Sequence, residues 1–311
     1  MIRGTPMEHK DLKRKQIFTL RLSALTFMER MESTMNQEMT GQENLVLYHR
    51  EGYLGTITLN RPGKRNAMSW ALWLALEKAI MEAEEDLEAR VVILQGEGKS
   101  FCSGLDLGPE NELLQAIGAT PGARQKMDFY RLVRRGQDIF TRLERLTKPT
   151  IAMIHGHCLG AGLEMVLCCD MRFCSAETLF GLPEPRLAII TDAGGLQRLP
   201  QVVGRGHARE IAFRGHHFDA GRAKAINLVN EVYPDTETLK TKIQEIAEEI
   251  ASNPPLAVQG IKEVLAFNEG SDVKHSLHFT AARSSMILPS EDLQEAITSY
   301  LEKRRGEFKG A

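Results

Sequence analysis

The sequence predicts an α/β fold in which strands and helices alternate, followed by a region that is helical throughout. Short apolar runs rich in β-branched residues alternate with helical stretches over residues 44–235, an order typical of parallel strands joined by helical crossovers. Residues 236–311 are helical by period or by composition. Residues 1–43 fit neither pattern. We therefore expect an N-terminal extension, an α/β core and a C-terminal helical region.

The core begins with a predicted β-hairpin. Its strands are LVLYHR at 45–50 and YLGTITLN at 53–60. Ser69 then has the side chain of a helix N-cap, and predicts a helix that runs to about residue 85. RVVILQ at 90–95 returns to a strand, and its unbroken apolar character indicates burial on both faces.

A loop and several helices complete the predicted elements. The glycines, prolines and polar residues of 108–126 have no clear period and predict a mobile loop. Residues 129–147 follow as an amphipathic helix, which ends before Lys148-Pro149 because the residue preceding a proline disfavours helix. Beyond residue 235 we expect four further helices, over 236–253, 255–267, 274–287 and 290–304.

A strand, a turn of small residues and a short helix are predicted between residues 150 and 169. Residues 150–154 form the strand, residues 156–162 the turn, and a buried helix entered at about Ala161 ends at Cys169. The first amides of a helix have no intrahelical partner and lie at the positive end of its dipole. They suit a carbonyl oxygen that gains negative charge, so this turn is a candidate oxyanion hole.

A second loop, GEGKSFCSGLDLG at 96–108, follows the strand at 90–95. The loops after the strands at 90–95 and 150–154 would then each direct one backbone amide toward the same oxygen. The glycines of either loop, taken alone, are also typical of an ordinary turn. Glu164 and Glu184 flank the turn, and paired carboxyls in an apolar site can supply an acid and a base. Taken alone, Glu164 could be a helix N-terminal acid and Glu184 a loop acid paired with Arg186.

Three motifs in this order resemble those of the crotonase (enoyl-CoA hydratase/isomerase) superfamily. IAMIHGHCLGAGLEMVLCCDM at 151–171 is similar to the family signature, SFCSGLDL at 100–107 to its first oxyanion loop, and LNRPGKRNAMS at 59–69 to its adenine-binding segment. The resemblance extends from about Glu43 to the C-terminus. It implies a spiral of repeated ββα units and oxyanion amides at Leu105 and Ala161.

By the same resemblance the substrate is an acyl thioester of coenzyme A, and no separate cofactor or metal is implied. The backbone of the adenine-binding segment would meet the adenine and its basic side chains the phosphates, although alone this Pro-Gly loop is also typical of a solvated turn. The residues implied in coenzyme A binding are Lys64, Arg65, Asn66, Ala67, Ser103, Gly104, Asp106, Leu107, Gly160 and Lys309, the last in a C-terminal tail.

The resemblance aligns Glu164 and Glu184 with the two catalytic glutamates of the hydratases. It therefore predicts an enoyl-CoA hydratase, which adds water across the 2,3 double bond. Asp192 is the departure, because hydratases commonly have glycine there and dienoyl-CoA isomerases have aspartate. The alternative reaction is therefore that of a 3,5-2,4-dienoyl-CoA isomerase, in which Asp192 and Glu184 would move a proton between distant carbons. The chain also departs from those isomerases, because they usually have aspartate in place of Glu164. Asp192 could equally be a helix N-cap, and a non-catalytic acyl-CoA binder is a further alternative.

Composition limits the partners and the compartment. A net charge of −2 and 6% aromatic residues argue against a nucleic-acid-binding role. Five cysteines without metal-site spacing favour a reducing compartment, and with no visible secretory signal we expect a cytoplasmic protein. The apolar stretch 150–169 carries two histidines, a glutamate and a glycine turn, so we do not expect it to span a membrane. The family resemblance implies a homotrimer or homohexamer, formed through the C-terminal helices.

Overall fold

A computed structural model of the protein describes residues 44–111, 113–115 and 122–311. The predicted N-terminal extension, 1–43, lies outside the described residues. The strands are β1 (Val46–Glu51), β2 (Leu54–Leu59), β3 (Val91–Gly96), β4 (Thr150–Ile154), β5 (His157–Leu159), β6 (Met171–Ser175), β7 (Leu179–Gly181), β8 (Phe218–Asp219) and β9 (Glu231–Tyr233). The helices are α2 (Trp70–Glu85), α4 (Ala123–Glu144), α5 (Ala161–Val166), α6 (Gly195–Arg214), α7 (Ala220–Ala225), α8 (Thr236–Ala251), α9 (Pro255–Asn268), α10 (Val273–Ile287) and α11 (Glu291–Glu302), with short 3₁₀ turns η1 (Pro62–Lys64) and η2 (Glu184–Leu187).

Six strands form the main sheet, in the order β1-β2-β3-β4-β6-β9. The predicted hairpin is confirmed, because β1 pairs antiparallel with β2. All the other neighbours in this sheet are parallel. The loops that follow β3 and β4 therefore leave from the same edge of the sheet, as the sequence required for two converging oxyanion amides.

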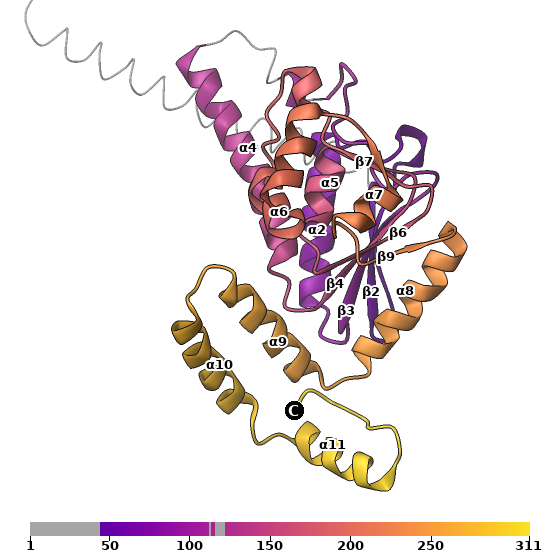
Figure 1. Cartoon of the computed structure of the whole chain (residues 1–311), viewed down its shortest axis with the longest axis vertical. Coiled ribbons are helices and arrows are strands. Elements are labelled where there is room, and N and C mark those ends of the chain that lie inside the picture. Colours follow the sequence, from indigo (N-terminus) through magenta and orange to yellow (C-terminus); the bar gives the residue numbers. More distant parts are fainter. Residues whose placement is uncertain (1–43, 112, 116–121) are drawn as a thin grey trace, which may run out of the picture. The chain divides into compact units, whose positions relative to one another are not determined.

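Helices cover both faces of the main sheet (Figure 1). Helix α2 packs on β1 and β2, and it contacts α4 through the stacked rings of Trp73 and Phe140, whose centroids lie 4.2 Å apart. Helix α8 covers the opposite face and buries the side chains that alternate inward from the parallel strands. That cluster comprises Leu54, Val91, Ile93, Ile151, Met153, Phe173, Leu239, Ile243, Ala247 and Ala251.

A second sheet, β5-β7-β8, lies beyond the carboxyl end of β4. It is joined to the loop after β3 by a parallel bridge between Cys102 and Cys158. The Cys102 amide donates to the His157 carbonyl at 2.8 Å, and the Leu159 amide donates to the Cys102 carbonyl at 3.0 Å. This pairing holds the two predicted oxyanion loops against each other.

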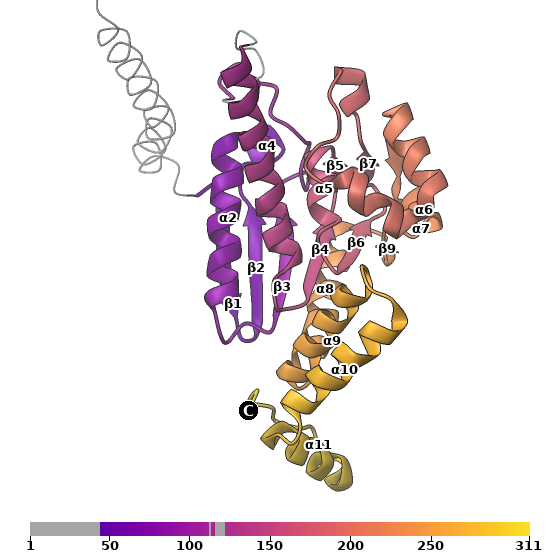
Figure 2. The ribbon, with the colours of Figure 1, turned by 90° about the vertical axis from the view of Figure 1, so that its left-hand side faces the viewer.

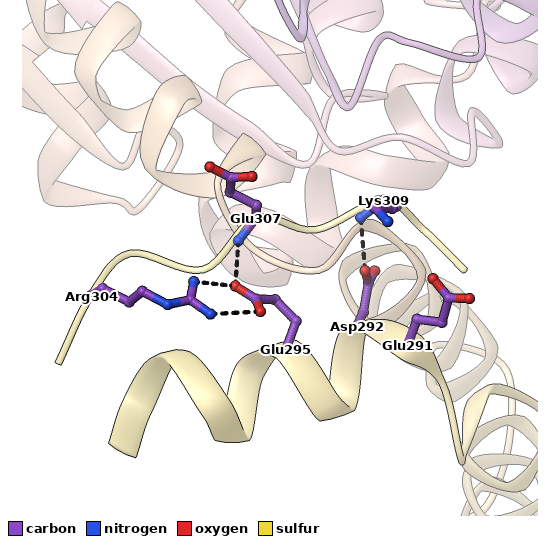
Figure 3. A pocket seen from close by; sticks show the side chains of 6 residues that line it. All are labelled: Glu291, Asp292, Glu295, Arg304, Glu307 and Lys309. Carbon is purple, nitrogen blue, oxygen red and sulfur yellow. Dashed lines mark hydrogen bonds and ion pairs between the residues drawn. The ribbon is translucent and has the colours of Figure 1, made fainter. Parts of the chain in front are cut away.

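The C-terminal helices extend below the core in Figure 2. Phe267 of α9 stacks on Phe279 of α10 at 4.3 Å, and Lys262 of α9 binds Asp170 of the core at 2.7 Å. The last residues fold back over α11, where they and the helix line a charged pocket (Figure 3). All four predicted C-terminal helices are present, and their bounds agree with the predictions within two residues. None of the described helices is long and apolar enough to cross a membrane.

Three predictions on helices need correction. Helix α4 begins at Ala123 and ends at Glu144, so the predicted loop at 108–126 ends earlier than expected, and part of it lies outside the described residues. Helix α5 stops at Val166 rather than Cys169, because the chain turns there toward Asp170. Helix α6 was not predicted: Pro200 and a non-helical Gly204 inside it break the helical pattern of its sequence.

Candidate active site

The two predicted oxyanion turns lie in direct contact. Gly104 and Gly160 both have positive φ, +93° and +51°, which a side chain would strain. A Cβ placed on Gly104 would lie 3.0 Å from the Leu159 carbonyl oxygen and 3.8 Å from the Gly160 Cα. Close approach of the two backbones therefore requires glycine at both positions.

The amides of Leu105 and Ala161 are available to a substrate. Neither N–H donates a hydrogen bond to any residue in the described part of the chain. Leu105 is held by the residues around it, since the Met68 amide donates to the Gly104 carbonyl and the Asp106 amide to the Met68 carbonyl. Ala161 is the first residue of α5. Two such amides on neighbouring turns fit the predicted oxyanion hole, which stays a prediction.

Glu164 is buried, with 2% of its surface exposed. Its Oε2 accepts a 2.7 Å hydrogen bond from the amide of Gly195, the first residue of α6. Burial raises the pKa of Glu164 to about 8, while the Gly195 bond lowers it and the charges of Glu184 and Asp192 raise it. Glu164 does lie in the first turn of its own helix α5, as one reading of the sequence expected, but its carboxyl binds the start of a different helix.

Glu184 lies against the oxyanion turn. A Cβ added to Gly160 would meet its Oε1 at 2.6 Å. Its Oε2 is buried and has no hydrogen-bond partner among the described residues. Burial raises the pKa of Glu184 and the charge of Asp192 adds to this, while hydrogen bonds from the Glu184 backbone and the Thr191 side chain lower it. Arg186 forms no ion pair with Glu184 within the described residues, so this carboxyl is not the paired loop acid that the sequence also allowed.

Asp192 supplies a third carboxyl close to the other two. It is not a helix N-cap: helix α6 begins at Gly195, its cap is Gly194, and no side chain there bonds the first amides in the manner of a cap. Partial burial raises the pKa of Asp192. Its carbonyl oxygen accepts a 2.6 Å hydrogen bond from Gln137 of α4. Asp192 is thus tied to α4, whereas Glu184 is against the oxyanion turn.

Two residues of the predicted coenzyme A set, Asn66 and Asp106, have side chains with partners inside the protein. The Asn66 side chain is fully buried, accepts from the Arg61 amide, and donates to the carbonyls of Glu97, Ser100 and Phe101. The buried Asp106 pairs with Arg61 and accepts from the Gly108 amide. Both side chains therefore hold the loops in place and are not free to bind a ligand.

The rest of the predicted coenzyme A set is divided between two places. Arg65, Ala67, Ser103, Gly104 and Leu107 lie with Gly160 around the oxyanion loops, since the Ser103 amide donates to the Arg65 carbonyl. Lys64 is exposed, 3.9 Å from Glu110.

Lys309 lies elsewhere in the chain. Its amide donates to Asp292 of α11 (Figure 3), and the carbonyl of its neighbour Phe308 accepts from Arg90 at the start of β3. Strand β3 spans about 20 Å, so within one chain Lys309 is at the opposite edge of the sheet from the other residues.

The five cysteines are all free and buried. Burial raises the pKa of Cys158 well above its ordinary value, which disfavours the thiolate that a nucleophile needs. Burial of all five thiols is typical of cysteines that pack in a core. Among the described residues no three His, Cys, Asp or Glu side chains form a group that could hold a metal ion.

A family model described as enoyl-CoA hydratase/isomerase matches residues 49–311. The chain belongs to this family. The resemblance found in three short motifs is thereby confirmed over nearly the whole described chain, and with it the fold and the class of enzyme.

Relatives of this enzyme carry the names of both candidate reactions. The mitochondrial Delta(3,5)-Delta(2,4)-dienoyl-CoA isomerase of Dictyostelium discoideum is 36% identical over 287 residues, which cover 92% of this chain and 98% of the relative. The short-chain-enoyl-CoA hydratase of Clostridium acetobutylicum is 35% identical, covering 84% of this chain and 96% of the relative. A crystal structure of an enoyl-CoA hydratase from Bacillus anthracis superposes with a TM-score of 0.78 at 33% identity, covering 86% of this chain and 100% of that one.

Two groups at the site were missed by the sequence analysis. Gly195 acts through its backbone amide, and Gln137 reaches Asp192 across 55 positions of sequence. A glycine or a glutamine in the sequence does not by itself indicate that it holds a catalytic side chain or segment in place. The only sequence pattern that could have pointed to Gln137 is its place on α4, on the same face as Thr141 and Glu144.

Proposed function

We propose that this enzyme moves a proton along conjugated acyl-CoA thioesters, converting 3,5-dienoyl-CoA to 2,4-dienoyl-CoA as its main reaction. The observation that carries the proposal is the third carboxyl, Asp192. The backbone carbonyl of Asp192 is bonded to Gln137 of α4, whereas the Glu184 carboxyl lies against the oxyanion turn at Gly160. A transfer between two distant carbons needs two such groups at different points along the acyl chain.

The proposed reaction consists of three proton transfers. The Glu184 carboxylate takes a proton from C2, and the electron pair of that C–H bond moves into the thioester, whose oxygen is stabilised as an enolate by the amides of Leu105 and Ala161. Asp192 then gives a proton to C6, and the electrons return so that double bonds form at C2–C3 and C4–C5. Proton transfer from Glu184 to Asp192 completes the cycle. Burial raises the pKa of both Glu184 and Asp192, and the charge of Asp192 raises that of Glu184 further, which suits carboxyls that must both accept and release protons.

Hydration is the second candidate, and a specific observation favours it. With a pKa of about 8, Glu164 is mostly protonated at neutral pH, so it could act as the acid that protonates C2 while Glu184 removes a proton from water attacking C3. The sequence analysis ranked this reaction first. We place isomerisation first because Asp192 is the third carboxyl of the site, and the name of the Dictyostelium discoideum relative supports this.

The test compares two substrates across three variants. Purified enzyme is given a 3,5-dienoyl-CoA and a 2-enoyl-CoA, and the change in conjugated thioester absorbance is followed for wild type, Asp192→Asn, Glu184→Gln and Glu164→Gln. We expect Asp192→Asn to lose isomerisation by about 10²- to 10⁴-fold. Asp138→Asn, an exposed change on α4, is the control. Efficient hydration that does not depend on Asp192, together with no isomerisation, would refute the proposal that isomerisation is the main reaction.

Coenzyme A enters this proposal only as part of the substrate, and we propose no separate cofactor, nucleic-acid partner or membrane partner. We also propose a homotrimer or homohexamer. It is supported by exposed apolar side chains on the C-terminal helices, among them Ile261, Leu277, Ile297 and Leu301. Analytical ultracentrifugation tests it, and a monomer at micromolar concentration would refute it. A cytoplasmic location stays a prediction, because relatives are named mitochondrial or peroxisomal.

A further inference from the structure

A stripe of polar side chains on α4 contacts the segment that carries Asp192 and the start of α6. Gln137, Thr141 and Glu144 follow the i, i+4, i+7 spacing of one helix face. Gln137 donates to the Asp192 carbonyl at 2.6 Å. Thr141 accepts from Arg198 Nη2 at 3.3 Å, and Glu144 binds Arg198 through two hydrogen bonds of 2.7 Å each. These five residues are called the α4–α6 seam below.

Arg198 connects this seam to Glu164. One turn before it, Gly194 accepts a 3.5 Å hydrogen bond from Arg198 Nη1, and the next amide, that of Gly195, holds the Glu164 carboxyl. The bond to Glu144 raises the pKa of Arg198, and the charge of Glu164 raises it further. The guanidinium thus lies close enough to Glu164 to interact with its charge. The same side chain therefore contacts α4 and the helix start that holds the Glu164 carboxyl.

The ion pair between Arg198 and Glu144 requires a specific geometry. The Arg198 side chain is 15% exposed, and its planar guanidinium forms two parallel bonds to one carboxylate, which a lysine amine cannot reproduce. Helix α6 contains a second arginine–glutamate pair, Arg214 with Glu210, at the same distance of 2.7 Å but with side chains 62% and 42% exposed. That pair lies beyond the kink at Gly204 and provides a matched control.

We propose that Arg198 is a positioning residue, which together with Glu144 holds the segment that carries Asp192, one of the two proton-transfer groups, against the helix start that binds Glu164. Helix α4 holds the Asp192 backbone through Gln137, and α6 holds the Glu164 carboxyl through Gly195. Arg198 locks the two helices to each other between these points. Because proton transfer is sensitive to displacements of about 1 Å, loosening this pair slows the chemistry more than it weakens substrate binding. The inference rests on the proposed function.

Steady-state kinetics on the full chain test it with four variants: Arg198→Lys, Glu144→Gln, their double variant, and the control Arg214→Lys. We expect kcat for the dienoyl-CoA to fall about 10- to 100-fold in either single variant, with KM changed less than about threefold. The double variant falls no further than the singles, because both changes break one contact. Arg214→Lys keeps the wild-type kcat. A kcat within about twofold of wild type in both single variants, even with a lowered melting temperature, overturns the proposal.

A second measurement does not depend on turnover. The carboxyl stretch of protonated Glu164, identified by its absence in Glu164→Gln, is followed by infrared spectroscopy against pH. Glu184, Asp192 and Arg198 are the charged groups near it. In Arg198→Lys we expect the midpoint to move upward, since a loosened Gly195 bond stabilises the carboxylate less. An unchanged midpoint overturns the positioning role. If wild type acts on neither thioester, the proposed function fails and this titration still decides the role of Arg198.

Discussion

Replacing Glu164 by glutamine is expected to stabilise the protein and to abolish hydration of a 2-enoyl-CoA, the reaction in which Glu164 would be the acid. The carboxyl is 2% exposed, and its pKa in the folded chain is about 8 against an ordinary value of 4.5. Between those two pH values the unfolded chain has lost the proton that the folded chain keeps, so wild-type stability falls as pH rises through this window. At 1.36 kcal/mol for each pH unit, the loss reaches about 5 kcal/mol at most. Glutamine carries no charge at any pH and can still accept from the Gly195 amide.

Urea unfolding at fixed protein concentration, followed by fluorescence of the buried Trp70 and Trp73, measures this at unit intervals from pH 5 to pH 9. The free energy of unfolding of Glu164→Gln should exceed that of wild type by an amount that grows with pH up to about 8 and is constant above it. Glu295→Gln is the opposite case, because the bond from Arg304 holds the pKa of Glu295 at about 2. Removing this charge is therefore expected to lower the free energy of unfolding at pH values above the ordinary pKa of glutamate. A Glu164→Gln variant that is less stable than wild type, or a difference independent of pH, refutes the reasoning.

Three further changes probe the turns and the loop beneath the site. Gly160→Ala should lose activity by about 10²-fold or more, since its φ is +51° and the new methyl would lie 2.6 Å from the Glu184 carboxyl; wild-type kcat would contradict this. Asn66→Ala should lower the free energy of unfolding by about 2–4 kcal/mol, because it leaves the four backbone partners of a fully buried amide unpaired; urea unfolding measures it, and a loss under about 0.5 kcal/mol would contradict it. Lys64→Met should raise KM for the thioester about fivefold, as expected for one exposed charge, with kcat unchanged; a kcat effect with constant KM would exclude a binding role.

The sequence predicted the elements whose signals are local. The hairpin follows from two alternating runs, and Ser69 caps α2 by accepting from the Leu72 amide as predicted. Glycines at 104 and 160 predicted turns, and both have the positive φ that only glycine adopts easily. Helix α6 was missed for the same reason, because local rules count Pro200 and Gly204 against a helix that tertiary packing nonetheless supports.

The residue types of the site could be predicted, but their partners could not. Lys64, Arg65 and Asn66 stand next to each other in a basic loop, yet the structure gives Asn66 four internal hydrogen bonds and leaves its neighbours exposed. Asp192 lies shortly before two glycines as an N-cap would, but α6 begins two residues too late for it. Such differences are decided by contacts between distant segments, which a local pattern does not contain.

The start of α6 explains why a site with three acids can exist in a folded chain. A buried carboxylate is costly unless it accepts hydrogen bonds from fixed donors. Gly195 provides one such donor to Glu164 at the positive end of a helix, and no Cβ can be added there without approaching the Glu164 Oε2 to 3.0 Å. The same helix start is tied to α4 through Arg198. The stability of this helix start and the placement of Asp192, one of the proton-transfer groups, therefore depend on one set of contacts.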